Sequence, residues 1–298
     1  MPAIEVARLT KSYGRARGVV DLTFSVERGE IFGYLGPNGA GKTTTIRTLL
    51  DFIRPSGGRA IVLGLDARRD AVEIHRRIGY LPGEYGLVER FTGLEQLTYL
   101  GSLRGGVDEP FLRDLTDRFD LDLGVHIASL SHGNKQKVGL IQAFMHRPEL
   151  VILDEPTQGL DPLMQQEFYR VLHEVRERGG TVFLSSHVMP EVEHVCDRVG
   201  IIRDGRLAAV EDIDDLKGKA LKMIEVRLAT AVPASTFEQV PGVQEVVAFG
   251  ERTRITVAGP IDPLVKALAR HEVIDLQSRE PSLEEIFLTF YGGADGAG

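Results

Sequence analysis

Short apolar runs and a glycine-rich loop organise the first part of the chain. Three apolar or alternating segments predict strands: residues 4–9, 19–26 and 31–35. The loop follows the third of these runs directly, and residues 43–53 after it are predicted to form a helix. Residues 84–147 are mainly helical in pattern. Within them, Thr92 and Glu95 match a capping box, and four leucines are expected to lie along one helix face: Leu94, Leu97, Leu100 and Leu103.

Two later runs, residues 151–153 and 181–184, are short and rich in apolar residues. That pattern is typical of strands buried on both faces of a sheet. Residues 162–178 lie between them and predict a helix with a polar face, which ends at Gly179-Gly180. Strand–helix–strand units of this kind indicate a parallel sheet with right-handed crossovers.

The pattern changes after an acidic stretch at residues 211–215. Six further elements are predicted: strand 223–228, helix 234–239, a hairpin of 243–249 and 252–257 that turns at Gly250-Glu251, helix 261–270 and strand 273–277. The order β-α-β-β-α-β is the ferredoxin-like arrangement. The sequence therefore predicts an α/β domain over residues 1–214, with a helical subdomain at about 84–148. A small α+β domain over 215–291 and a disordered tail at 292–298 are expected to follow.

Composition and charge limit the possible functions. Hydrophobic residues make up 43% of the 298 residues and charged residues 26%, as in ordinary soluble globular proteins. The 43 acidic and 35 basic residues give a net charge of −8, which argues against a large nucleic-acid footprint but leaves a local basic patch open. The single cysteine, Cys196, excludes an intramolecular disulfide. We see no signal peptide and no apolar stretch near the roughly 20 residues that span a bilayer, so a membrane role is expected to need a partner.

The glycine-rich loop at residues 36–43 fits the pattern G-x-x-x-x-G-K-[ST]. Backbone N–H groups at the start of a helix bind phosphates, and glycines let the chain close around them. The residues expected to contact the nucleotide are Gly36, Asn38, Gly39, Ala40, Gly41, Lys42, Thr43 and Thr44. Lys42 would reach the β- and γ-phosphates, and the Thr43 hydroxyl would bind Mg²⁺. A chance glycine turn is the alternative, but the strand before the loop and the helix after it favour a nucleotide site.

An acidic pair follows the apolar run at residues 150–153. Asp154, at the carboxyl end of the predicted strand, is well placed to hold Mg²⁺ through water. Glu155 is expected to point the opposite way, as successive strand residues do, and to be free to polarise the attacking water. An ordinary acidic turn is the alternative, which the nearby phosphate loop disfavours.

The order of these motifs resembles that of the ATP-binding subunits of ABC transporters over about residues 4–214. Residues 130–136, Leu-Ser-His-Gly-Asn-Lys-Gln, are similar to the family signature Leu-Ser-Gly-Gly-Gln. The resemblance implies that Ser131 and Gly133 close over the γ-phosphate of ATP bound to a second subunit. Taken alone, Ser-x-Gly before a helix is usually a cap.

The resemblance assigns three more residues. Tyr13 matches the aromatic that stacks on adenine, Asp161 the residue of a loop that crosses the dimer interface, and His187 the histidine that contacts the γ-phosphate. Without the family pattern, these would be interpreted as a packed tyrosine, a helix-initiating turn before Pro162 and a structural histidine.

Two departures from the family pattern stand out. After Tyr80-Leu81-Pro82 the family usually has a glutamine that contacts Mg²⁺ or water and senses the membrane partner. This chain has Gly83, followed by Glu84, which could substitute from one position away. The signature has His132 and Asn134 in place of glycine and glutamine, but Ser131 and Gly133 are kept.

Residues 281–288 resemble the C-terminal motif of drug-resistance (daunorubicin-type) exporter ATPases. Ser282 and Glu285 match a capping box. Four apolar residues after it share a helix face: Leu283, Ile286, Phe287 and Phe290. That face is either core packing of the small domain or a dimer or regulatory contact.

The expected protein is therefore the ATP-hydrolysing motor of an ABC-type exporter for drugs, antibiotics or other hydrophobic compounds. It would use ATP and Mg²⁺, with Glu155, His187 and Lys42 as catalytic residues. It would lie peripherally on the cytoplasmic face of the cell membrane, with a separate transmembrane permease and a second ATPase subunit, taken as another copy of this chain. Two other classes are weighed: a non-transport ABC ATPase that acts on nucleic acid or ribosomes, and a non-hydrolysing regulatory partner. The acidic balance opposes the first, and the intact set of reactive residues opposes the second.

Overall fold

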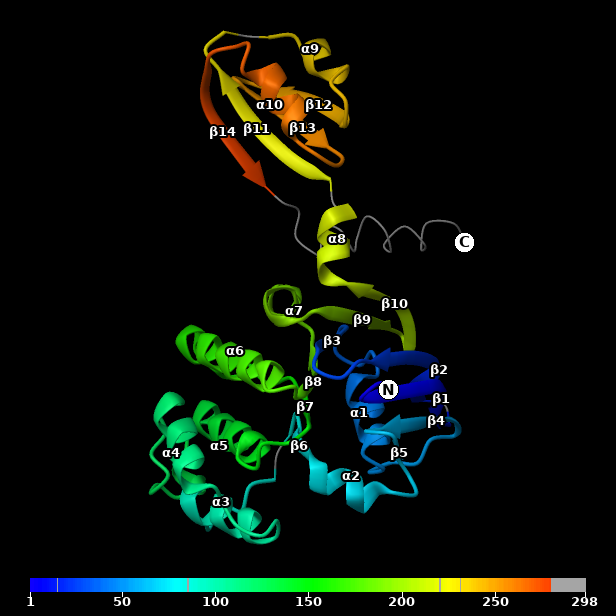
Figure 1. Cartoon of the computed structure of the whole chain (residues 1–298), viewed down its shortest axis with the longest axis vertical. Coiled ribbons are helices and arrows are strands. Elements are labelled where there is room, and N and C mark those ends of the chain that lie inside the picture. Colours follow the sequence, from blue (N-terminus) through cyan, green and yellow to red (C-terminus); the bar gives the residue numbers. More distant parts are fainter. Residues whose placement is uncertain (15, 85, 220, 231, 280–298) are drawn as a thin grey trace. The chain divides into compact units, whose positions relative to one another are not determined.

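A computed structural model describes residues 1–14, 16–84, 86–219, 221–230 and 232–279 (Figure 1). The chain divides into two compact units, Met1–Val210 and a second that begins at Glu211. We call them the N-terminal and C-terminal units. The capping box at Ser282 and Glu285, its apolar helix face and the tail at 292–298 lie outside the described residues.

The N-terminal unit contains a six-stranded and a four-stranded sheet. The first has the order β10-β9-β3-β8-β7-β6: β3 (Ile31–Leu35), β6 (Ile78–Leu81), β7 (Leu150–Asp154), β8 (Thr181–Ser186), β9 (Arg198–Arg203) and β10 (Arg206–Asp212). The second has the order β2-β1-β4-β5: β1 (Ile4–Tyr13), β2 (Ala16–Val26), β4 (Gly57–Val62) and β5 (Leu65–Asp66). The predicted parallel sheet is confirmed, because β9, β3, β8, β7 and β6 pair in parallel. β3, β7 and β8 are buried at every residue, as expected for largely apolar strands in the centre of a parallel sheet.

Helices flank the six-stranded sheet (Figure 1). In chain order the helical elements of this unit are α1 (Lys42–Leu49), α2 (Ala71–Arg77), α3 (Gly93–Ser102), α4 (Glu109–Arg118), a 3₁₀ turn (Ile127–Ser129), α5 (His132–Phe144), α6 (Pro162–Glu177) and α7 (Met189–Val195). The first is shorter than predicted. It ends at Leu49 because Asp51 adopts a left-handed backbone, with φ of 53°, which stops the helix before Ile53.

Four aromatic rings join the two sheets of the N-terminal unit. Phe24 on β2 stacks against Phe32 and Tyr34 on β3 and Phe183 on β8, with ring centroids 5.5–6.3 Å apart. Ile46 of α1 is buried in the same core cluster. Aromatic pairs at this spacing add about 0.5–1.5 kcal/mol each beyond their buried area. The stack therefore fixes β3, whose end leads into the glycine-rich loop.

The helical segment confirms one prediction and corrects another. Thr92 caps α3 with the predicted capping box, its side chain accepting from the Glu95 N–H and its own N–H donating to the Glu95 carboxylate. The prediction that four leucines share one buried face is wrong. Only Leu97 is buried, while Leu94 and Leu103 are 49% and 68% exposed. Three residues turn a helix by about 300°, so leucines repeated every three positions spiral around it instead of sharing a face.

His146, just after α5, is held neutral by its surroundings. Its Nε2 lies 2.9 Å from the Ile78 carbonyl oxygen and donates to it, since a carbonyl can only accept. Burial, followed by the nearby charge of Arg104, lowers the pKa of His146 from 6.5 to about 4. The folded protein therefore binds this proton less readily than the unfolded chain.

This lowered pKa predicts an acid-sensitive stability. Because the unfolded chain takes up the proton near pH 6.5 and the folded chain only near pH 4, the free energy of unfolding should fall as the pH drops between these values. The contribution of His146 is about 2 kcal/mol. Urea unfolding at pH 7 and 4.5 should show a smaller loss for His146→Gln than for the parent chain. An equal loss in both would contradict the assignment.

The C-terminal unit has one antiparallel sheet in the order β12-β13-β11-β14. After α8 (Ile213–Lys219) its elements are β11 (Lys222–Leu228), α9 (Ser235–Glu238), β12 (Val243–Phe249), β13 (Arg252–Val257), α10 (Asp262–Leu268) and β14 (Val273–Arg279). The predicted β-α-β-β-α-β order is confirmed. The hairpin turns where predicted, since Phe249 pairs with Arg252 across Gly250 and Glu251. A small core forms from Ile224, Val226, Phe237, Ile255, Val257, Leu264 and Leu268.

Candidate nucleotide site

The glycine-rich loop leaves the buried end of β3 and enters α1. Its first residue, Gly36, donates its N–H to the Ser186 carbonyl at 3.1 Å. A Cβ at Gly36 would lie 2.3 Å from the Ile202 carbonyl oxygen, so no other residue fits there. Gly41 has φ of 111°, a conformation that other residues rarely adopt. Backbone contact and backbone conformation thus explain two of the glycines in the motif.

The first turn of α1 is arranged to receive an anion. Its N-cap, Gly41, makes no side-chain capping bond, and no acidic residue lies in the first turn. The first N–H groups of a helix have no partner within the helix and lie at its positive end. These donors are therefore available to phosphate oxygens, as the sequence motif requires.

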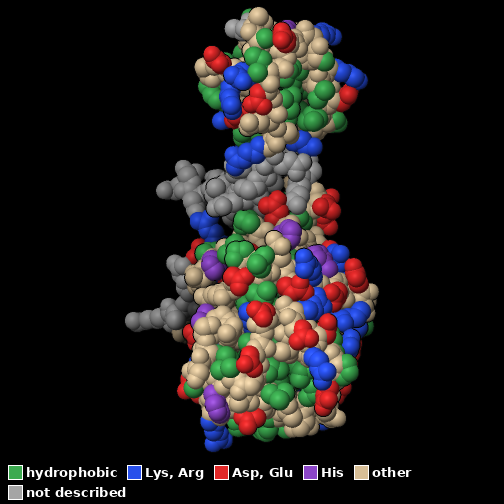
Figure 2. Space-filling model, turned by 90° about the vertical axis from the view of Figure 1, so that its left-hand side faces the viewer, with side chains coloured by type: hydrophobic (Ala, Val, Ile, Leu, Met, Phe, Trp, Pro, Cys, Tyr) green, Lys and Arg blue, Asp and Glu red, His purple; other side chains and the backbone are tan. Residues whose placement is uncertain are grey.

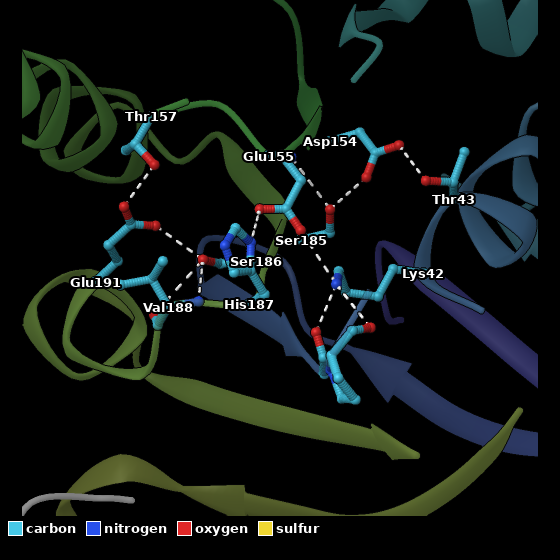
Figure 3. Close-up of polar contacts among 12 residues, drawn as sticks. Lys42, Thr43, Asp154, Glu155, Thr157, Ser185, Ser186, His187, Val188 and Glu191 are labelled. Atoms are coloured by element: carbon cyan, nitrogen blue, oxygen red, sulfur yellow. Dashed lines mark hydrogen bonds and ion pairs between the residues drawn. The ribbon is translucent and has the colours of Figure 1, made fainter. Parts of the chain in front are cut away.

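Lys42 lies at the centre of the site, with only 6% of its side chain exposed. Its Nζ donates to the Gly36 and Pro37 carbonyls, at 2.5 and 3.3 Å, and lies 3.1 Å from Glu155 Oε1 (Figure 3). A buried ammonium is stable only where it is paired. The ammonium is thus held between the loop carbonyls and one carboxylate.

Thr43 and Asp154 meet on the opposite side of the loop (Figure 3). The Thr43 hydroxyl donates to Asp154 Oδ2 at 2.7 Å, and the Ser185 hydroxyl donates to Asp154 Oδ1 at 2.5 Å. Asp154 is only 1% exposed. A hydroxyl and a carboxylate beside a phosphate loop are the oxygen ligands that Mg²⁺ uses in such sites, together with phosphate oxygens and water. The described residues contain no cluster of three His, Cys, Asp or Glu, and Mg²⁺ held in this way needs none.

Glu155 corrects the simple strand argument. β7 ends at Asp154, and Glu155 has a left-handed backbone with φ of 53°, so the alternation of a strand does not apply to it. The sequence predicted that this carboxylate would be free, but in the structure it is engaged on both sides. It pairs with Lys42 on one side and lies 2.7 Å from His187 Nδ1 on the other. The three side chains converge on one point (Figure 3).

The signature segment begins α5. The Ser131 hydroxyl accepts from the Asn134 N–H at 3.2 Å, which is a helix cap. A Cβ at Gly133 would lie 2.6 Å from the Gly159 carbonyl, so the glycine is needed for backbone contact with the loop that follows Glu155. Contact of Ser131 and Gly133 with a second subunit's nucleotide stays a prediction.

Two other predicted residues, Asp161 and Tyr13, lie at the surface at element ends. Asp161 caps α6, accepting from the N–H groups of Leu163 and Met164, each at 3.0 Å. Tyr13 ends β1 and is 45% exposed, with the Lys11 ammonium 5.1 Å from its ring centroid. Their roles at an interface and at adenine stay predictions.

Gly83 lies beside the candidate metal ligand. A Cβ built there would be 3.4 Å from Asp154 Oδ2. The position of the absent glutamine therefore faces the carboxylate, but offers it no side chain. Glu84 is exposed. Its substitution for the glutamine stays a prediction.

Sequence reasoning did not single out two residues that shape this site. Gln136 of α5 donates to the Pro156 carbonyl at 2.8 Å and lies 3.4 Å from that of Glu155. Glu191 of α7 accepts from Thr157 and Ser186. No local sequence pattern indicates these contacts, because the partners of each residue are far from it in the sequence.

Fold and site together define the class. A parallel sheet, a phosphate loop, an acidic pair at a strand end and a histidine after the next strand are the parts of a P-loop ATPase. The family model for ABC transporters matches residues 19–158.

The chain belongs to the ATP-binding proteins of ABC transporters. It is 35% identical to the bacitracin transport ATP-binding protein BcrA of Bacillus licheniformis, covering 97% of both chains. It is 30% identical to the linearmycin resistance ATP-binding protein LnrL of Bacillus subtilis, covering 97% of this chain and 98% of that one. A solved ATP-binding subunit of an ABC transporter is 33% identical, with a TM-score of 0.68 over 72% of this chain and 92% of that one. The chain is thus an ATP-binding and ATP-hydrolysing subunit, and none of these relatives favours the nucleic-acid alternative.

Proposed function

We propose that this chain is the motor of a membrane exporter that confers resistance to an antibiotic or another hydrophobic compound. The convergence of Lys42, Glu155 and His187 beside the Thr43–Asp154 pair supports ATP hydrolysis at this site. The similarity to a bacitracin transport protein and a linearmycin resistance protein over nearly the whole chain supports the direction of transport. None of the helices within the described ranges is long and apolar enough to cross a bilayer.

Each side chain has a distinct part in the proposed reaction. Lys42 and the N–H groups of α1 would hold the phosphates, while Thr43 and Asp154 would hold Mg²⁺, whose charge would offset that of the transferred phosphoryl group. Glu155 accepts a proton from the attacking water. His187 orients Glu155 and stabilises charge on the γ-phosphoryl group. Catalysis is mainly positioning and electrostatic stabilisation, as in other phosphoryl transfers.

The second half of the site is proposed to come from another copy of this chain. Ser131 is exposed at the N-terminus of α5, and Asp161 is exposed at the N-terminus of α6. An exposed helix N-terminus suits a phosphate. Hydrolysis would then require two chains to close around ATP, so turnover should rise more steeply than linearly with protein concentration.

A groove in the N-terminal unit is proposed to receive the permease. It encloses about 450 Å³ between the end of α1, α2, β6, α3 and α5. Phe52, Val72 and Leu103 line it and are more than half exposed. Gln142 and His146 also line it. The groove thus offers apolar contact, which suits the apolar face of an amphipathic segment.

Acidic and basic side chains are interspersed on the face of the N-terminal unit shown in Figure 2, and no broad basic area gathers among the described residues there. A nucleic-acid partner would need such an area. The view therefore agrees with the acidic balance of the chain, and we propose no nucleic-acid role.

Leu103→Glu should prevent association with the permease and leave basal ATPase activity unchanged. A charge in the groove must be desolvated when an apolar segment covers it, which costs several kcal/mol unless it is paired. Co-purification from membranes, with the companion protein identified, measures the association. Val265→Glu changes another exposed apolar residue, one in the C-terminal unit, and should retain the permease.

Retention of the permease by Leu103→Glu would contradict the groove assignment. Cells that express the chain and its permease should also survive higher concentrations of a cell-envelope antibiotic than cells without them. Equal sensitivity across a panel of such compounds would contradict the proposed export of drugs.

A further inference from the structure

Glu191, in α7, has both carboxylate oxygens engaged beside the nucleotide site. Oε1 accepts from the Thr157 hydroxyl at 2.5 Å, and Oε2 accepts from the Ser186 hydroxyl at 2.8 Å. Figure 3 shows the carboxylate between these two side chains. Hydrogen bonds to an ionised acceptor are shorter and stronger than neutral ones. Glu191 is therefore a firm link between two segments.

Each linked segment positions a reactive side chain. Thr157 lies two residues after Glu155 and is buried, at 7% exposure. Ser186 directly precedes His187, and its hydroxyl also accepts from the Val188 N–H at 2.9 Å. The link thus joins the turn that follows Glu155 to the backbone on both sides of His187.

The backbone at Glu155 needs such support. A residue other than glycine at φ of 53° is strained by about 1–3 kcal/mol and persists only where its surroundings hold it. Three contacts do so. The Glu155 N–H donates to Ser185, Gln136 donates to the carbonyl of Pro156, and Thr157 is held by Glu191. The first and the last of these contacts both reach the segment that leads to His187, and the last does so through the carboxylate of Glu191.

We propose that Glu191 is a positioning residue for ATP hydrolysis. It fixes the turn of Glu155 against the segment of His187, and so maintains the 2.7 Å contact between the two reactive side chains. It touches neither the phosphate loop nor the metal ligands among the contacts described. The inference rests on the proposed roles of Glu155 and His187. The simpler role for Glu191 is stabilisation of α7, in whose first turn it lies.

The test separates kcat from ATP affinity in the full chain. Glu191→Ala should lower kcat about 10- to 100-fold, because small displacements of reacting groups have effects of this size. The Kd for ATP should stay within about threefold, since binding depends on residues 36–43. Thr157→Val, which removes only the hydroxyl, should lower kcat in the same way. Glu191→Gln keeps one acceptor oxygen and should recover part of the rate, and Glu177→Gln, an exposed charge on α6, should have no effect.

The two changes should also be non-additive. If Glu191 acts through Thr157, the double variant Glu191→Ala with Thr157→Val should be no slower than Glu191→Ala alone. A folded Glu191→Ala chain with unchanged kcat would overturn the proposal, as would fully additive losses. If Glu191→Ala does not fold, Thr157→Val and Ser186→Ala decide by the same criteria. If Glu191→Ala fails to slow turnover, Glu155→Gln shows which assignment is wrong. If Glu155→Gln retains turnover, the site assignment itself is wrong. If Glu155→Gln loses turnover, only the role of Glu191 is wrong.

Discussion

Replacing Glu155 by glutamine is expected to abolish ATP turnover while ATP binding is kept. Glutamine has nearly the same shape, but its amide cannot accept a proton from water, and removal of such a base costs about 10²–10⁴-fold. The substitution also removes the ion pair with Lys42. Glu155 then no longer competes with the phosphates for the Lys42 ammonium. The variant should therefore bind ATP as tightly as the parent or more tightly.

Two measurements check this expectation. Phosphate release should be lost, and size-exclusion chromatography with Mg-ATP should show a stable dimer that the parent chain forms only transiently. Glu177→Gln again provides a matched change of charge at an exposed position. Hydrolysis by Glu155→Gln at the parent rate would rule out Glu155 as the base.

Lys42→Met is expected to remove both binding and hydrolysis. Methionine is unbranched and only one atom shorter than lysine, so the substitution removes the charge of the buried side chain and largely preserves its packing against the loop. A charge-assisted hydrogen bond is worth about 1.5–3 kcal/mol, and Lys42 would make more than one to the β- and γ-phosphates. We therefore expect ATP affinity to fall at least about 100-fold.

The loss is measured by titration calorimetry with ATP, and thermal unfolding shows whether the variant is folded. Lys266→Met alters an exposed lysine of the C-terminal unit and should bind ATP normally. Tight ATP binding by a folded Lys42→Met chain would place the phosphates elsewhere.

Local patterns predicted much of the fold and the main groups of the site. The short, largely apolar runs form β7 and β8, and the capping box at Thr92 is present as expected. The strand and helix pattern of the C-terminal part forms an antiparallel sheet with two helices. Such features can be predicted because they depend on residues close together in the sequence, or on whether a segment is buried on one face or on both. The phosphate motif was equally clear, because its chemistry requires a fixed spacing of glycines, lysine and threonine.

The wrong predictions have a common cause. The leucines from 94 to 103 were placed on one face from their spacing alone, but burial depends on which side of α3 meets the rest of the subdomain. Glu155 was assigned the alternation of a strand that had already ended. Gln136 and Glu191 contact residues 20 and 34 positions away. No local pattern indicates contacts of that range.

The support of the phosphate loop has a consequence for biosynthesis. The loop lies within the first 43 residues, but its geometry depends on residues that are translated much later. Gly36 is held by the Ser186 carbonyl and lies against Ile202, and β3 runs between β8 and β9. A nascent chain that has reached only α5 contains the whole motif but neither of those flanking strands. The cell therefore acquires a competent ATP site only near the end of translation of the N-terminal unit, and a truncated fragment cannot consume ATP through this geometry.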